Sequence, residues 1–154
     1  VLFALEMGLV GAHDGHLVPA ARELESEIRL LVPVIGGPAV GTWTVRPVAG
    51  GFALALEYVE ERDGQVTYQG HGVHAQDART GQLAAFWFDS IGVVPKAGVA
   101  ATLDGDRYTY TEHTPGGQSR FTYAWEGGVF TFTIDRSADG VAWAPMHVGT
   151  YRRV

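Results

Sequence analysis

The sequence contains no cysteine and few basic residues, and both features limit its chemistry. Because none of the 154 residues carries a thiol, disulfides, thiolate metal sites and thiol nucleophiles are excluded. A cysteine-free composition is typical of a cytoplasmic protein, which is the location we expect. Lys and Arg number 11 against 17 Asp and Glu, and the net charge of −6 argues against a nucleic-acid partner, which would need a basic surface.

Long hydrophobic runs are missing too. No apolar stretch approaches the ~20 residues that span a bilayer, so we expect no membrane span. Glu6 interrupts the apolar opening and no basic residue precedes it, which does not favour a signal peptide. The chain contains no Gly-x-Ser-x-Gly nucleophile elbow and no glycine-rich phosphate loop that leads into a helix.

Aromatic residues and glycine-rich turns are plentiful, and from residue 40 onward the hydrophobic pattern has a period of two. Turn pairs such as Asp63-Gly64 and Gly127-Gly128 interrupt it at short intervals, which is typical of antiparallel hairpins. The pattern predicts an all-β fold, an antiparallel up-and-down β-barrel. The expected strands are 41–48, 52–61, 65–75, 82–90, 98–103, 107–113, 119–126, 129–135 and 142–152.

The N-terminal part has a different pattern. Ala21, Leu24, Ile28 and Leu31 recur at helical spacing, so we predict one short helix over about residues 19–31 that packs on or caps the barrel. Residues 9–15 are bounded by glycine and are consistent with a first strand. No linker or repeat divides the chain, and we expect residues 1–154 to form a single domain.

Turn lengths predict the pairing of the later strands. A two-residue turn at Gly127-Gly128 pairs Glu126 with Val129 and places an aromatic face inside. The residues expected to meet on that face are Trp125 with Phe130, Tyr123 with Phe132, and Phe121 with Ile134. A turn from Thr114 to Gly117 brings Tyr108 and Tyr110 inward and leaves His113 outside.

Two further turns also predict which residues lie in the interior. These predictions depend on the assumed turn length, because an error of one residue in that length moves the side chains of a strand to its opposite face. A four-residue turn over 137–140 pairs Arg136 with Val141. It places Trp143, Pro145, His147 and Tyr151 inside, with His147 opposite Phe130. A five-residue connection over 77–81 pairs Gln76 with Gln82, so that His71 faces Trp87 and Gln69 faces Asp89. One face of that hairpin then holds His71, Trp87 and Asp89, the other holds Tyr68, Phe86 and Phe88, and the pattern does not choose between them.

With these residues laid out, the chain resembles a family of small bacterial calycin-like (lipocalin-like) β-barrel proteins of unknown function. The matching motifs run from about residue 41 to residue 152. They include Gly41-Thr42-Trp43, Gly70-His71-Gly72-Val73, Trp87-Phe88-Asp89-Ser90, Arg120-Phe121-Thr122-Tyr123 and Gly149-Thr150-Tyr151-Arg152. The first third departs from the family pattern, since His13 stands where the opening strand of the family has Trp. The resemblance implies a barrel with an internal pocket.

The leading functional hypothesis is the binding of a small hydrophobic or aromatic molecule in a partly polar interior. Trp43, Trp87, Tyr123 and Trp125 would supply aromatic surface. The predicted polar lining comprises His71, Asp89, Tyr108, His147 and Tyr151.

Three alternatives stay open. The same barrel could be an isomerase, cyclase or lyase that uses His71 with Asp89, or His147, for proton transfer. The simpler interpretation of Asp89, which we favour over a catalytic role, is an Asx-type turn at the end of its strand. It could also bind haem through His147 or His13, or a divalent metal through His71, His147 and Asp89, although we expect no cofactor. Finally, it could bind no small ligand and use its outer face to form a homodimer.

Overall fold

The computed structural model describes residues 9–10, 18–19, 24–26, 39–92, 95, 97–114 and 116–152, and most of these lie in β-strands. The long strands begin at residue 40. Their bounds are β4 Val40–Val48, β5 Ala53–Arg62, β6 Gln65–Gln76, β7 Leu83–Asp89, β8 Val99–Asp104, β9 Arg107–Thr114, β10 Gly117–Glu126, β11 Val129–Ser137 and β12 Ala144–Arg152. Three short strands precede them, namely β1 Leu9–Val10, β2 Val18–Pro19 and β3 Leu24–Ser26.

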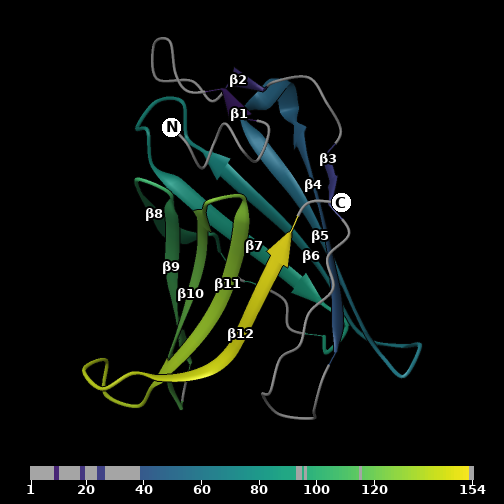
Figure 1. The fold of residues 1–154 in the computed structure, drawn as a ribbon. Coiled ribbons are helices and arrows are strands. Elements are labelled where there is room, and N and C mark those ends of the chain that lie inside the picture. Colours follow the sequence, from purple (N-terminus) through teal and green to yellow (C-terminus); the bar gives the residue numbers. More distant parts are fainter. Residues whose placement is uncertain are drawn as a thin grey trace.

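The strands from β3 to β12 form one antiparallel sheet in which every strand pairs with its neighbours in the sequence. Figure 1 shows that this sheet curls into a half-barrel. The predicted all-β, up-and-down architecture is therefore confirmed. Among the described residues no strand pairing joins β12 to β3 or β4, so these ladders do not close a barrel.

The N-terminal helix is not confirmed. Leu24–Ser26, within the predicted helix, is strand β3, and Leu24 pairs with Val45 of β4. Pro19 belongs to β2, and the remaining positions of the predicted helix lie outside the described residues. Backbone pairing at the edge of a sheet overrides a helical pattern of side chains here. In the described part of the chain the only helical segment is a 3₁₀ turn, η1, at Ala49–Gly51.

Where a tight turn joins two strands, the predicted pairing is confirmed. Glu126 pairs with Val129, which brings Trp125 opposite Phe130. Gly117 pairs with Thr114, and His113 is exposed as expected. In these hairpins the short turn fixes the register of the two strands. At Gly127 and Gly128, positive φ angles of 57° and 77° allow two residues to form the whole loop.

The predicted pairing of β11 with β12 is wrong, because the turn between them is longer than four residues. Arg136 pairs with Ala144, not with Val141. The carboxylate of Asp139 accepts hydrogen bonds from the backbone N–H groups of Val141 and Ala142, at 2.8 and 3.0 Å, and holds the longer loop. Trp143 therefore precedes the strand.

A bulge between Ile134 and Asp135 restores the inward face of β12. His147 consequently lies opposite Ile134 and not opposite Phe130, whose partner is Tyr151. The predicted inward position of Tyr151 is confirmed, since it is fully buried.

The hairpin of β6 and β7 is shifted by one residue from the prediction. Gln76 pairs with Leu83, because the connection takes six residues and ends with a hydrogen bond from Asp77 N–H to the Gln82 carbonyl. Trp87 then lies opposite Gly72, and Asp89 opposite Gly70. Neither predicted face is correct, because a shift of one residue exchanges the faces of one strand relative to the other.

The corrected pairing explains the two glycines of β6. The Trp87 indole covers both of them, and a Cβ added at Gly70 or Gly72 would overlap the ring. Gly41 has the same relation to the ring of Tyr58, and Gly149 to that of Tyr151. Glycine on these strands thus makes room for large rings on the inner face.

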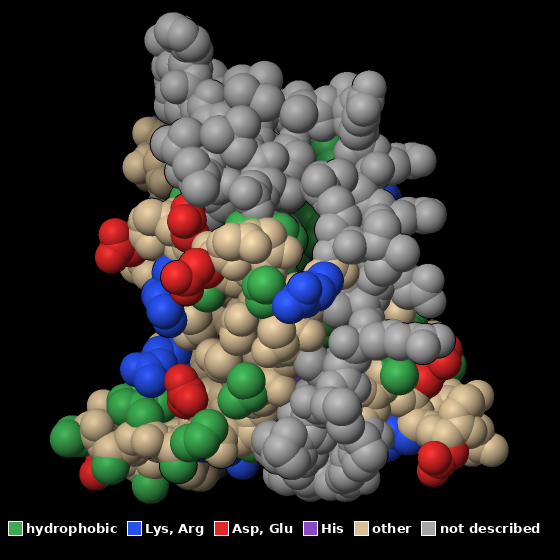
Figure 2. Space-filling model, in the orientation of Figure 1, with side chains coloured by type: hydrophobic (Ala, Val, Ile, Leu, Met, Phe, Trp, Pro, Cys, Tyr) green, Lys and Arg blue, Asp and Glu red, His purple; other side chains and the backbone are tan. Residues whose placement is uncertain are grey.

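The outer surface is mixed in character. Figure 2 shows acidic and basic side chains side by side over the strands, while hydrophobic side chains gather over the loop between β11 and β12. Val141 of that loop is 83% exposed. Most of the large rings lie on the inner face, although Phe88 is an exposed ring on the outer face of β7.

Replacing Gly70 with Ala should destabilise the fold by about 1–3 kcal/mol, the usual cost of overpacking, because the new Cβ would meet the Trp87 ring. Urea denaturation checks this. Gly116→Ala is the matched control, since Gly116 has no atom within 4 Å of an added Cβ and does not have a positive φ. Equal stability of the two variants would contradict the assignment.

Candidate functional site

The inner face of the half-barrel is an aromatic surface that several strands supply in common. We call it the concave face. Its buried members are Trp43, Val45, Leu54, Leu56, Tyr58, Ala85, Tyr108, Tyr110, Tyr123, Phe130, Phe132 and Tyr151, and Tyr68, Leu83, Trp87, Val99, Ala101, Leu103, Phe121, Trp125 and Ile134 pack against them.

Trp43 of β4 lies at the centre of the concave face. Its ring is 4.6 Å from that of Tyr58 on the neighbouring strand, 5.7 Å from Trp87, and 5.4 Å from Phe132 on β11. Strand β11 lies near the other end of the sheet, so the contact with Phe132 crosses the interior. Trp43 therefore holds the two ends of the curled sheet together through side chains.

Tyr58 and Tyr151 continue this contact across the interior. Burial raises the pKa of both hydroxyls, and each hydroxyl influences the pKa of the other, which places them near one another. Hydrogen bonding from Trp43 and Tyr58 offsets part of the rise in the pKa of Tyr151. These tyrosines are neutral at physiological pH and provide polar atoms without charge.

His74 of β6 occupies another part of the concave face, among three tyrosines. Its ring stacks on Tyr108 at 4.7 Å and meets the edges or faces of Tyr110 and Tyr123 at 6.0 and 5.3 Å. Burial lowers its pKa to about 3, so the imidazole is neutral. Its Nε2 atom is buried and makes no hydrogen bond with any described residue.

A short hydrogen-bond chain joins β6 to β7. The Trp87 Nε1–H donates to the Tyr68 hydroxyl at 2.9 Å, and that hydroxyl donates to Asp89 Oδ2 at 3.3 Å. Burial and the Asp89 carboxylate raise the pKa of Tyr68 to about 12, although the Trp87 hydrogen bond lowers it. Asp89 Oδ1 also accepts the Ile91 N–H at 3.1 Å, which is the turn-forming role predicted as its simpler interpretation.

A second carboxyl group faces this chain from β9. Burial raises the pKa of Glu112, and the charge of Asp89 raises it further. The two carboxyl groups thus lie close enough to interact, although their strands are separated by β8. This part of the concave face is acidic.

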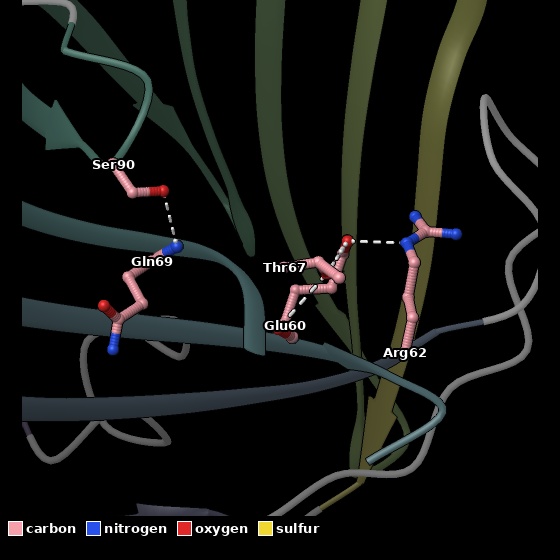
Figure 3. Close-up of polar contacts among 5 residues, drawn as sticks. All are labelled: Glu60, Arg62, Thr67, Gln69 and Ser90. Carbon is pink, nitrogen blue, oxygen red and sulfur yellow. Dashed lines mark hydrogen bonds and ion pairs between the residues drawn. The ribbon is translucent and has the colours of Figure 1, made fainter. Parts of the chain in front are cut away.

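The charged part of the concave face continues on β5. Glu60 Oε1 accepts hydrogen bonds from Arg62 Nε at 3.0 Å and from Thr67 Oγ1 at 3.1 Å (Figure 3). Burial lowers the pKa of His147 on β12. The Glu60 carboxylate raises this pKa, and the Arg62 guanidinium lowers it. His147 is therefore within electrostatic range of this ion pair, although β12 and β5 lie toward opposite ends of the sheet.

A nearby contact closes the hairpin between β6 and the residue after β7. The Gln69 N–H donates to Ser90 Oγ at 3.1 Å, as Figure 3 also shows. Together with the Asp89 turn, this contact fixes the end of β7 beside β6, so that Asp89 keeps its inward position.

The structure brings most of the predicted site residues together and separates one from the rest. Those on the concave face are Trp43, Trp87, Asp89, Tyr108, Tyr123, Trp125, His147 and Tyr151. His71 lies on the opposite face of β6, where its Nδ1 is 2.7 Å from Glu57 Oε1 in an exposed hydrogen bond. The hypothetical His71–Asp89 proton-transfer pair is not assembled. His13 lies outside the described residues.

The site residues predicted from the sequence did not include His74, Tyr68, Tyr58 or Glu112. The pattern contained a signal for His74, because His71 and His74 are three residues apart and so occupy opposite faces of a strand. If His71 points outward, His74 must point inward. Tyr68 and Glu112 would follow from the same alternation once the register is known.

Cofactor and membrane features are limited in the described part of the chain. There, no group of three or more His, Asp or Glu side chains is arranged to hold a metal ion. None of its helices is long and apolar enough to cross a bilayer.

The fold and the concave face define a class, an antiparallel half-barrel with an aromatic and partly polar interior. Comparison with known proteins does not make this more specific. No protein-family model matches the chain, and no curated protein is found to be similar to it. The calycin-like resemblance therefore stays a prediction from the motifs.

Replacing His74 with Leu should make the protein more resistant to acid. The folded state takes up a proton on His74 at pH about 3, and the unfolded state does so near 6.5. Between these values the unfolded state binds more protons, so His74 reduces stability as the pH falls, by up to about 5 kcal/mol. Urea denaturation of both proteins from about pH 7 to pH 4 should show a shallower loss of stability in His74→Leu. An unchanged slope would show that His74 is not buried in its neutral form.

Proposed function

We propose that this protein binds a small, flat, apolar or aromatic molecule on its concave face, as a calycin-type barrel would. The main supporting observation is the aromatic cluster centred on Trp43, which combines rings with buried polar atoms. Among the described residues, Trp125 Nε1, His74 Nε2 and His147 Nε2 are buried without a hydrogen-bond partner. Buried polar groups are nearly always satisfied, so three such atoms on one face favour a ligand that supplies the missing bonds.

The arrangement of rings suits a flat ligand. Tyr110 stacks on Phe121 with a 13° angle between the ring planes, and Trp125 stacks on Phe130 with a 25° angle. Parallel rings present broad faces to a planar molecule, and tyrosine and tryptophan add hydrogen-bonding atoms at their edges. The charged residues Glu60, Arg62 and Asp89 would contact the more polar end of the ligand.

Small side chains provide a direct test of the concave face. Ala101 of β8 pairs with Tyr110 on this face, while its neighbour Ala100 is exposed on the other. Ala101→Phe should weaken binding of the neutral fluorescent probe N-phenyl-1-naphthylamine by about tenfold or more, equivalent to ~1.4 kcal/mol, because the new ring occupies the ligand surface. Ala100→Phe should bind as the parent protein does. A fluorescence titration measures both affinities.

Two results would contradict the proposal. One is a parent protein that binds no such probe and carries no small molecule in native mass spectrometry after purification without denaturation. The other is equal weakening by Ala100→Phe and Ala101→Phe, which would place binding on the outer surface. Circular dichroism of both variants verifies that the fold is kept.

A further inference from the structure

The surroundings of His74 indicate which chemical group of a ligand would reach it. His74 pairs with Leu54 on β5 and with Ala85 on β7, and both are buried and apolar. Its ring contacts across the interior are with Tyr108, Tyr110 and Tyr123. No charged side chain occurs among these neighbours.

Along β6 this uncharged part of the concave face is separated from the charged part, and on β9 the two parts meet at Tyr110, whose pKa the Glu112 carboxylate raises. Along β6, His74 lies six residues beyond Tyr68, which contacts the Asp89 carboxylate. Six residues of strand correspond to about 20 Å. A ligand that extends along the concave face would therefore meet carboxyl groups at one end and neutral rings with a single imidazole at the other.

The imidazole is nine-tenths buried, yet its Nε2 has no partner among the described residues. An unsatisfied polar atom in such a place destabilises the free protein, and a leucine would fill the position without that cost. Proteins tolerate such groups where function needs them. We infer that His74 Nε2 is a hydrogen-bonding anchor for a neutral hydroxyl group on an aromatic ligand, an inference that rests on the proposed ligand-binding function.

A hydroxyl suits this position better than a charged group. A carboxylate or ammonium would lose its hydration among Leu54, Ala85 and three tyrosine rings, with no opposite charge to compensate. A hydroxyl can both donate and accept, so it satisfies Nε2 in either tautomer of the neutral ring. Tyr108 stacks on one face of the imidazole, with 18° between the ring planes, whereas a hydrogen bond to Nε2 lies in the plane of the ring.

The test compares two probes of nearly equal shape, 2-naphthol and 2-methylnaphthalene, by equilibrium dialysis at about pH 7. The protein should bind the naphthol about tenfold more tightly, the effect of one neutral hydrogen bond to a buried atom. His74→Leu should lose this preference while still binding both probes. His74→Gln, which keeps a polar atom, should retain part of it. His113→Leu is the matched control, because His113 is exposed, and it should bind as the parent protein does.

The outcomes separate the two proposals. If the parent protein binds both probes equally, or if His74→Leu keeps the preference, the anchor is wrong while binding on the concave face stands. If neither probe binds, the proposed function fails and the anchor fails with it. A second readout does not depend on ligand: His74→Leu should unfold at the same or a higher temperature near pH 7, and a large loss of stability would show that Nε2 is already satisfied within the protein.

Discussion

The contact of Trp43 with rings on distant strands is the interaction on which the rest of the structure depends. Each hairpin of the sheet can form from local pairing alone, but a meander of hairpins has no reason to curl by a fixed amount. The rings of Trp43, Phe132 and Tyr151 meet across the interior and set that curvature. Because no strand pairing closes the described sheet, side-chain packing replaces the missing ladder.

Glycine is the second element of this arrangement. On β6, Gly70 and Gly72 allow the Trp87 indole to lie flat against the backbone, which brings its Nε1–H to the Tyr68 hydroxyl. The tyrosine then holds the Asp89 carboxylate. The Gly-His-Gly motif thus acts through its glycines, and the histidine between them points outward to Glu57.

Polar groups divide the concave face into two regions with different chemistry. One region contains the carboxyl groups of Glu60, Asp89 and Glu112, together with Arg62 and His147. There Asp89 raises the pKa of Glu112, and Glu60 raises the pKa of His147. Around His74 every neighbour is neutral, and burial keeps the imidazole uncharged. A binding face of this kind distinguishes the two ends of a ligand by hydration, since one region can accept a charge and the other cannot.

The sequence by itself determined the fold class, most of the strands and the inward face of the strands joined by the turns at Thr114–Gly117 and Gly127-Gly128. Alternation and positive-φ turn residues act over a few residues, so Tyr108, Tyr123 and Trp125 could be assigned inward from the sequence. Only the tertiary structure decided the longer connections. The six-residue loop after β6 and the Asp139 loop before β12 shift the register, and with it the positions of His71, His74 and His147. The physical reason is that side chains alternate between the two faces of a strand. The local pattern does not give the length of a longer loop, and an error of one residue in that length assigns a histidine to the wrong face.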